Sequence, residues 1–230
     1  MKQNLLKYSA LVITLIFIIN TTQAQRYSFG ASGGFGQTNT GNVMLSRSFG
    51  IGANKKLFIA PAIRIGYASS STLNFISAPA KITKDKDRID TLSVGNTGII
   101  AANLALNIGY KFKEKFALVF NIDLVGLSFG SEQKAIFLPG EASKNQLISS
   151  RATTAKPTST NILLVGDNDF GTLNSALTLH YYLTPKISIN AGVGFLFTEY
   201  TSNISLGAAN NDRFRYKTFQ GVLGVNYYFE

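Results

Sequence analysis

Few side chains in this sequence are suited to covalent or acid–base chemistry. Cysteine is absent, and there is a single histidine, His180. Acyl transfer usually needs a nucleophile activated by a base, and histidine is the commonest base. His180 alternates with apolar residues in a run that ends at a short Thr-Pro-Lys connection. This context indicates a hydrogen-bonded interior residue, so we predict no catalytic residue and no enzyme activity.

Carboxylates that could bind a metal or act as a pair occur in two polar segments. Asp85, Asp87 and Asp90 lie in DKDRID, and Asp167 and Asp169 lie in GDND. Neither segment has the spacing and the terminal Glu of a calcium loop. Without cysteine, no thiolate zinc site can form. We interpret these carboxylates as solvated loop charge, with weak cation binding as the alternative, and we predict no metal and no cofactor.

Polar residues inside apolar runs say more about the fold. The segment KFALVFNIDLVGLSFG carries Asn121 and Asp123, and large apolar residues fill every second position from Phe116 to Leu124. Successive side chains of a strand point to opposite faces. The run therefore predicts a strand with one apolar face and one face that accepts polar groups. It is too short to cross a bilayer as a helix, but it is typical of a transmembrane β-barrel.

The same two-residue period recurs along the chain and predicts eight strands. They are residues 27–37, 43–53, 57–67, 98–110, 116–129, 170–183, 187–200 and 215–229. A tilted strand crosses a membrane in about 9–11 residues, which these lengths provide. An alternative is a water-soluble sandwich, but it has no need for apolar faces on so many strands.

The connections between these strands alternate in length. Those at 53–56, 111–115 and 184–186 are short, and those at 68–97, 130–169 and 201–214 are long, with 38–42 as a shorter one. Outer-membrane barrels have short periplasmic turns, longer outer loops and an even number of strands. We therefore predict an all-β fold, an eight-stranded antiparallel transmembrane β-barrel with both termini on the periplasmic side.

Three polar residues face inward at the middle of the predicted barrel: Arg64, Asn103 and Asp123. Eight strands leave a bore that side chains can fill, and buried charges need partners. We expect Arg64 to pair with Asp123 in a structural plug, with a gated polar path as the alternative. A second inward-facing group of polar residues is expected near the inner rim. It comprises Asn107, His180 and Asn190.

Two residues do not fit the regular alternation. Arg47 falls on the apolar phase of its strand, which predicts either a bulge or a position near the outer rim. After Gly126 the apolar phase changes, so we expect strand 116–129 to bend or to leave the membrane there.

The N-terminus has the features of a secretory signal peptide. Lys2 and Lys7 precede an apolar stretch at 11–19, and Thr22-Gln23-Ala24 offers small residues for cleavage. We predict a signal peptide at 1–24 and a barrel domain at 25–230, with a retained anchor as the alternative. The formal net charge of +10 comes from cations scattered over the connections. They are interpreted as charges that meet water and anionic headgroups, and nucleic-acid binding is excluded.

Three features carry a family resemblance: the sequence TTQAQ at the end of the predicted signal peptide, the alternating strands, and the C-terminal sequence GVNYYFE. The chain resembles the small outer-membrane β-barrels of the OmpA-membrane-domain and OmpX-like type, in a form common among Bacteroidota. The resemblance implies that the C-terminal aromatic and the alternating residues before it are read by the barrel-assembly machinery. The matching residues here are Leu223, Val225, Tyr227 and Phe229, and Glu230 follows them.

The predicted function is that of a non-enzymatic barrel that acts through its outer loops. Its partners would be outer-membrane lipid, lipopolysaccharide and surface proteins, in adhesion or envelope integrity. The apolar islands 135–138 and 162–165 are expected to extend strands beyond the membrane and to offer an exposed edge. The alternatives are a secretion subunit similar to PorT-like type IX barrels, a narrow transporter for small hydrophobic molecules and a lipid-modifying enzyme.

Overall fold

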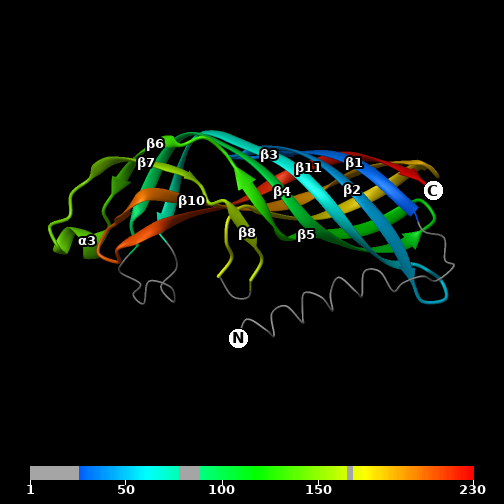
Figure 1. Ribbon diagram of the computed structural model, residues 1–230. Helices are drawn as coiled ribbons and strands as arrows, with labels where there is room; N and C mark the ends of the chain where they lie inside the picture. The colour runs from blue at the N-terminus through cyan, green and yellow to red at the C-terminus, as the bar shows by residue number, and fades with distance from the viewer. Residues whose placement is uncertain (1–25, 78–88, 165–167) are drawn as a thin grey trace.

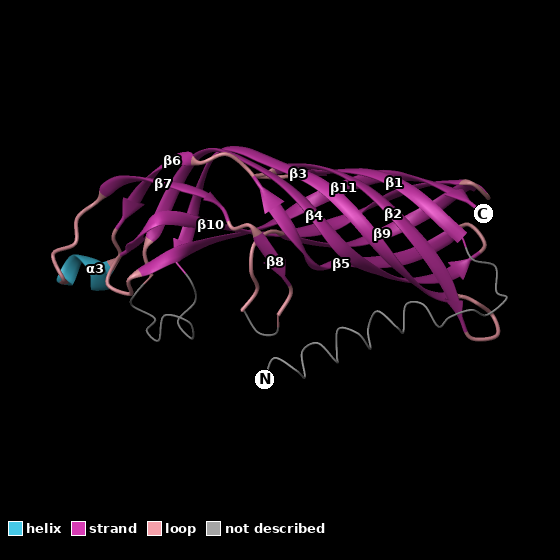
Figure 2. Ribbon diagram, viewed as in Figure 1, coloured by secondary structure: helices cyan, strands magenta, loops and turns pink. Residues whose placement is uncertain are grey.

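The computed structural model describes residues 26–77, 89–164 and 168–230. The predicted signal peptide, 1–24, lies outside the described residues. The described residues form an all-β molecule, in which eleven strands belong to one antiparallel sheet that closes into an elongated barrel (Figures 1 and 2). Within these residues, no helix has the length and apolar character needed to cross a membrane.

Part of this sheet is a ring of strands that pair in sequence order. Its strands are β1 (Arg26–Phe35), β2 (Asn39–Ile51), β3 (Leu57–Ser77), β4 (Thr91–Lys113), β5 (Phe116–Phe129), β9 (Leu173–Thr184), β10 (Ile187–Leu206) and β11 (Asn211–Phe229). β5 pairs with β9, although other elements lie between them in the chain. Pairing of β11 with β1 closes the ring. We call the end at which β1 begins and β11 finishes the proximal end, and the opposite end the distal end.

The ring is apolar outside and polar inside. On β3, Ile63 and Ile65 are 55% and 51% exposed, whereas Arg64 between them is 6% exposed. The same alternation runs through the other strands, with exposed large residues such as Val193 and Phe219. Water-soluble proteins rarely expose a continuous apolar belt of this extent. The outer face of the ring is therefore matched to an apolar surrounding, and the interior is matched to polar side chains.

The distal half of the molecule is a second ring, which we call the head. Four further elements come from residues 130–169: β6 (Gln133–Leu138), α3 (Glu141–Asn145), β7 (Arg151–Pro157) and β8 (Thr160–Ile162). In the head, β3, β4, β6, β7, β10 and β11 pair in this order, and β11 returns to β3 through Phe214 and Ser77. Figure 1 shows β6, β7 and α3 at the end opposite the C-terminus.

The head has an apolar core of its own. Its fully buried members include Phe75, Leu92, Phe137, Tyr200 and Phe214. The rings of Phe75 and Tyr200 pack with their centroids 4.9 Å apart. The interior of the molecule therefore changes from polar in the proximal half to apolar in the head.

The prediction of a long loop at 68–97 was wrong. The described parts of 68–97 are mostly strand, because β3 continues to Ser77 and β4 begins at Thr91. A polar Ser-Ser-Ser-Thr run at 69–72 hides this continuity in the sequence, although Leu73 and Phe75 resume the alternation and enter the head core. The exposed edge expected at 135–138 is also absent, since this part of β6 pairs with β4 on one side and β7 on the other.

Arg47 is placed differently from both expectations. It lies opposite Tyr27 towards the proximal end, and the β2–β3 register is unchanged across it, from Ser46 with Ala62 to Phe49 with Ile59. Its guanidinium carbon lies 5.4 Å and 5.2 Å from the ring centroids of Tyr27 and Phe49. Cation–π contact of this kind explains how an arginine is accommodated on the apolar face without a bulge.

The predicted irregularity in β5 is present two residues before Gly126. The β4–β5 register shifts between Leu104 and Ala105, where β5 contributes an extra residue. Leu124 and Val125 are consecutive, yet both side chains are exposed. This bulge changes which residues face outward, and it marks the place where β5 separates from β9.

Candidate functional site

The structure brings the three predicted residues of the lumen together from three neighbouring strands. Arg64 on β3 lies with its Nε 3.4 Å from Oδ1 of Asp123 on β5. Asn103 on β4 donates from Nδ2 to Oδ2 of the same carboxylate over 2.8 Å. Arg64 also donates from Nη2 to Oδ1 of Asn121 over 2.8 Å. Arg64, Asn103 and Asp123 are all buried, so these contacts fill the bore of the ring.

The position of Asp123 follows from the separation of two strands. Pairing between β5 and β9 runs from Phe116 with Tyr181 to Ile122 with Ser175, and it stops there. At the next step, Oδ2 of Asp123 accepts a hydrogen bond from the backbone N–H of Asn174 over 2.8 Å. The carboxylate thus replaces a backbone carbonyl that β5 no longer supplies, which satisfies a buried donor.

A second amide, Asn161, extends this network from β8. Asn161 pairs with Gly126 of β5, and Gly126 pairs with Asn103 of β4, so the three residues form one row across the sheet. Because Gly126 has no side chain, Nδ2 of Asn161 can donate to Oδ1 of Asn103 over 2.7 Å. Oδ1 of Asn161 accepts from the N–H of Thr172 over 2.8 Å. We call this whole network, centred on Arg64, Asp123, Asn103 and Asn161, the plug.

The plug is suited to holding the barrel shut. It contains one cation and one anion, and its remaining polar groups are amides that already have partners. A buried pair of this kind, with hydrogen bonds on most of its polar atoms, is stable only while all its members are present. It offers no nucleophile with an adjacent base, so its arrangement supports a structural role.

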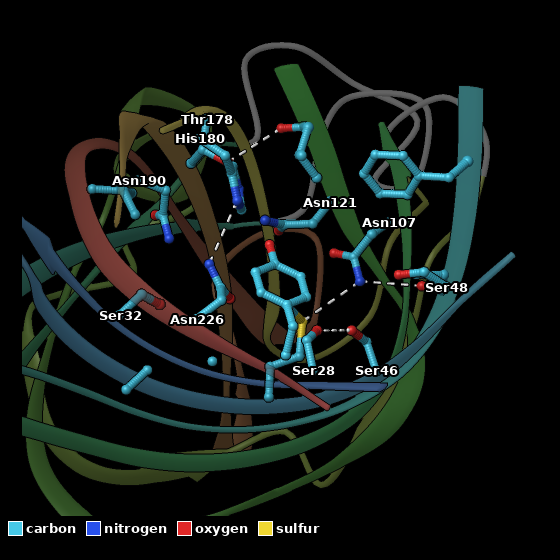
Figure 3. A pocket seen from close by; sticks show the side chains of 18 residues that line it. Ser28, Ser32, Ser46, Ser48, Asn107, Asn121, Thr178, His180, Asn190 and Asn226 are labelled. Atoms are coloured by element: carbon cyan, nitrogen blue, oxygen red, sulfur yellow. Dashed lines mark hydrogen bonds between the residues drawn. The ribbon is translucent and has the colours of Figure 1, made fainter. Parts of the chain in front are cut away.

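A separate cavity lies between the plug and the proximal end (Figure 3). Asn107, His180 and Asn190, the residues expected near the inner rim, all line it, and its volume is about 70 Å³. Nε2 of His180 lies 3.1 Å from Oγ1 of Thr178, and Nδ1 lies 3.5 Å from Nδ2 of Asn226. No described carboxylate lines this cavity, so the imidazole is held by a hydroxyl and an amide and has no carboxylate partner there. The space suits a few ordered waters.

A charged cluster at the junction with the head was not predicted. Glu199 on β10 is fully buried on the outward phase of its strand. Its carboxylate accepts from Arg213 over 2.9 Å and 2.8 Å, and from Nε of Arg215 over 3.0 Å. The cluster is covered by the segment before β9, because Arg213 stacks on the Phe170 ring and both arginines donate to the carbonyl of Asp169. Burial lowers the pKa of Arg215, and the charge of Glu199 opposes that shift.

Asp90 corrects the interpretation of DKDRID as solvated loop charge. Its residue is 1% exposed, its N–H donates to Oγ of Ser77, and its Oδ1 accepts from the N–H of Gly140 over 2.8 Å. Asp90 therefore ties β3 to the segment before α3 at the distal end of the head. Asp85, Asp87 and Asp167 lie outside the described residues. Asp169 accepts from the N–H of Leu164, and no metal-binding cluster of His, Asp and Glu occurs in the described ranges.

The missed residues had little signal in the sequence. Glu199 and Arg215 have opposite charges on neighbouring strands, but their direct pairing depends on the strand register beyond the tip at 207–210. Asn161 lies just before the apolar island 162–165, and nothing in the sequence indicated that it would face the lumen. Asn161 is buried where β8 pairs with β5, and Glu199 is buried where the segment before β9 covers it.

Comparisons with protein-family models and with curated proteins found no match. Among solved structures, the chain is similar to a major outer membrane protein from Thermus thermophilus, with 13% identity and a TM-score of 0.41 over 90% of this chain and 100% of that one. It is also similar to Neisserial surface protein A, with 11% identity and a TM-score of 0.36 over 89% and 96% of the two chains. A third is the Pseudomonas putida toluene transporter TodX, at 8% identity and a TM-score of 0.23 over 91% and 80%. At these identities and scores, no property of those proteins is transferred to this chain.

Proposed function

We propose that this chain is an integral outer-membrane β-barrel protein without enzyme activity, which acts at the cell surface through its head. The inside-out ring carries the proposal. On β3 the exposed apolar positions run from Leu57 to Tyr67, and Arg64 is buried among them. This length fits a tilted membrane-crossing strand of about 9–11 residues, and the alternation fits lipid outside with a polar interior.

In this proposal the proximal ring, with its eight strands, crosses the membrane with its proximal end in the periplasm. Support comes from the connections: those at 52–56, 114–115 and 185–186 are short, whereas the distal end carries the whole head. Short turns on the periplasmic side and larger elements outside are the usual arrangement of such barrels. Both termini of the barrel domain would then be periplasmic.

The proposed barrel does not conduct solutes. The plug occupies the bore, and the head closes over it with an apolar core. An ion that entered from the distal side would meet the head core, where it would lose its hydration without compensation.

Its partners would be outer-membrane lipid with lipopolysaccharide around the belt and the assembly machinery during biogenesis. Recognition by the assembly machinery is supported by the C-terminal aromatic and the alternating residues before it, whose side chains are exposed on β11. These residues are Leu223, Val225, Tyr227 and Phe229. β11 pairs with β1 to close the ring, so this face belongs to the last strand of the barrel.

The head supplies a surface for partners outside the membrane. Thr91 of β4 pairs with Ile76 on one side and Leu138 on the other, and both apolar side chains are exposed. Ile136 is exposed on the same strand as Leu138. Exposed apolar residues in one area favour contact with another molecule, as adhesion or envelope integrity would require.

Site-directed labelling tests the location and the orientation. The chain has no cysteine, so Lys134→Cys in the head and Lys186→Cys at the proximal end each introduce one thiol. A membrane-impermeant maleimide should label Lys134→Cys on intact cells and Lys186→Cys only after the outer membrane is permeabilised. The reverse pattern would overturn the orientation, and fractionation with soluble protein would overturn the membrane assignment.

A second candidate function is narrow transport of small hydrophobic molecules. The separation of β5 from β9 favours it, because among the described residues only the short strand β8 continues the wall beside β5 at that point. Val125 pairs with Ile162, so a disulfide between cysteines at these positions would lock β8 to β5. Uptake of a hydrophobic dye into liposomes that is lost on locking and restored by reductant would support transport. That the chain is a subunit of a secretion apparatus stays a prediction. Co-purification of a complex with partner proteins would test it.

A further inference from the structure

A wide concavity opens at the proximal end, beyond the plug and the small cavity around His180. Its volume is about 920 Å³, and four cationic side chains line it: Arg26, Lys55, Lys111 and Lys186. Glu230 is the one acidic side chain among the described residues of the lining. Small-molecule sites usually enclose about 300–1,000 Å³, so the space is of ligand size. We call this concavity the proximal basin.

The cations of the basin come from separate strands and turns that the fold holds at one mouth. The N–H of Lys111 on β4 donates to the carbonyl of Lys56 over 2.8 Å, and the N–H of Tyr228 on β11 donates to the carbonyl of Lys186 over 2.8 Å. Gly50 leaves room for the stem of Lys55, since a β-carbon at residue 50 would come within 2.9 Å of the Lys55 β-carbon. The positive charges therefore converge because of backbone geometry.

Aromatic rings hold two of these cations in place. The guanidinium of Arg26 lies 4.5 Å from the ring centroid of Tyr228, and Nζ of Lys111 lies 5.7 Å from that of Tyr182. None of the four forms an ion pair with another described residue. Burial lowers the pKa of Lys111, and the nearby charge of Arg26 lowers it further. The two cations repel each other across a partly desolvated space, and a bound anion would relieve this repulsion.

We propose that the proximal basin binds a multivalent anion that carries phosphate or carboxylate groups. Arg26 presents a planar fork that suits a phosphate or carboxylate, and the lysines add point charges around it. Cations that share a concave, partly desolvated space attract anions more strongly than scattered surface charges do. The inference concerns a ligand site that the proposed surface role of the head does not require.

Calorimetry with inorganic tripolyphosphate tests the site, on the full-length protein in a zwitterionic detergent at low ionic strength. The basin variant is Lys55→Gln, Lys111→Gln and Lys186→Gln. The matched control is Lys56→Gln, Lys113→Gln and Lys115→Gln, which removes the same charge from exposed positions at the same end. The basin variant should bind at least about tenfold more weakly, whereas the control should stay within about twofold of the unaltered protein.

Absence of binding by the unaltered protein, or equal weakening in both triple variants, would overturn the proposal. Heat-modifiable gel mobility checks that each variant is folded. If the triple variant does not fold, Lys55→Gln alone, at an exposed turn, should still weaken binding by a measurable factor, and an unchanged affinity would reject the site.

Nanodiscs distinguish two sources of the anion, a lipid headgroup and a soluble ligand. If phosphatidylglycerol headgroups fill the basin, tripolyphosphate should bind in phosphatidylcholine discs and be displaced in discs rich in phosphatidylglycerol. If the ligand is soluble, the affinity should be similar in both kinds of disc apart from general charge screening. Either result supports the site, whereas no binding in both discs rejects it.

Discussion

At the scale of single residues, the polar side chains in the bore substitute for missing backbone contacts. Asp123 accepts from the N–H of Asn174 where β5 has left β9, and it also faces Arg64. Asn161 accepts from the N–H of Thr172 one step further. An aspartate in an apolar strand is therefore explained by the geometry of the wall around it. Each of these contacts predicts a specific loss when it is removed.

Removing the carboxylate should cost more than removing the whole ion pair. Asp123→Ala leaves Arg64, which is 6% exposed, without its counter-charge, and such a loss typically costs about 3–5 kcal/mol of folding free energy. Arg64→Met in the same chain should recover part of this, because the uncompensated charge is then gone. Denaturant unfolding in liposomes measures the cycle. Strictly additive losses would mean that the two residues do not interact.

Gly126 should be intolerant of a side chain for a reason visible in the plug. In Gly126→Ala, the new methyl group would overlap Oδ1 of Asn103 and separate Asn103 from Asn161. Leaving buried amides without partners costs about 1–3 kcal/mol. Gly95→Ala on β4 is the control, because a β-carbon there meets nothing within 4 Å. Equal stability of the two variants would contradict the role given to Gly126.

Tyr200 should make the head sensitive to strong alkali. Burial raises the pKa of Tyr200 from 10.0 to about 12. A raised folded-state pKa means that its contribution to stability is complete below pH 10.0 and is lost as the pH rises through about 12. Tyr200→Phe keeps the packing against Phe75 and removes this titration. The free energy of unfolding, measured from pH 9 to 12, should therefore fall less steeply with pH in the variant than in the unaltered protein. Parallel curves would rule this contribution out.

At the scale of elements, single strands serve two environments in succession. β3 is in the belt as far as Tyr67, where its outward side chains are apolar, and it enters the head beyond the serine-rich run. β10 and β11 do the same, with Glu199 and Arg215 at the transition. On β3 the odd-numbered residues face outward as far as Tyr67 and inward at Leu73 and Phe75, so the phase inverts within the serine-rich run.

Two lysine substitutions on β3 should separate these environments. Ile63→Lys places a cation on the outward face of the belt, which costs about 2–4 kcal/mol near a bilayer midplane. Asn74→Lys places the same cation on an exposed outward position of the head, and it should be almost neutral. The folding yield in liposomes, measured by heat-modifiable mobility, compares them. Tolerance of Ile63→Lys would reject the assignment of this face to lipid.

At the scale of the whole molecule, two rings share strands but not a core. The proximal ring is held by backbone pairing, its plug and its surroundings, whereas the head buries apolar residues as a water-soluble protein does. The head should therefore lose order without opening the proximal ring. Local unfolding of this kind is expected where one part of a protein has its own packing.

Neighbouring substitutions on β6 test this independence. Phe137 is 0% exposed and Ile136 is 54% exposed, so Phe137→Ala should cost about 3–5 kcal/mol of head stability, and Ile136→Ala should cost little. Limited proteolysis should cut the head of the Phe137 variant and leave a membrane-protected fragment. Loss of heat-modifiable mobility at the same denaturant concentration as head cleavage would mean that the two rings unfold together.

The sequence alone determined the alternation and the strands that carry it. Outward-facing and interior residues differ at every second position, so the local pattern was sufficient to predict β5 from Phe116 to Phe129 with its polar residues Asn121 and Asp123. The same pattern placed Arg64, Asn103 and Asp123 on the inward side, and their pairing was expected because buried charges need partners.

Only the tertiary structure decided where the proximal ring ends and what replaces it. The head depends on β3 meeting β11 and on β6 and β7 entering between β4 and β10, contacts between residues far apart in the chain. A local period cannot encode which strand edges meet, because backbone hydrogen bonds are the same for every sequence. The burial of Asp90 follows from the closure of the head, and that of Glu199 from the segment before β9 that covers it, so neither could be predicted from local pattern.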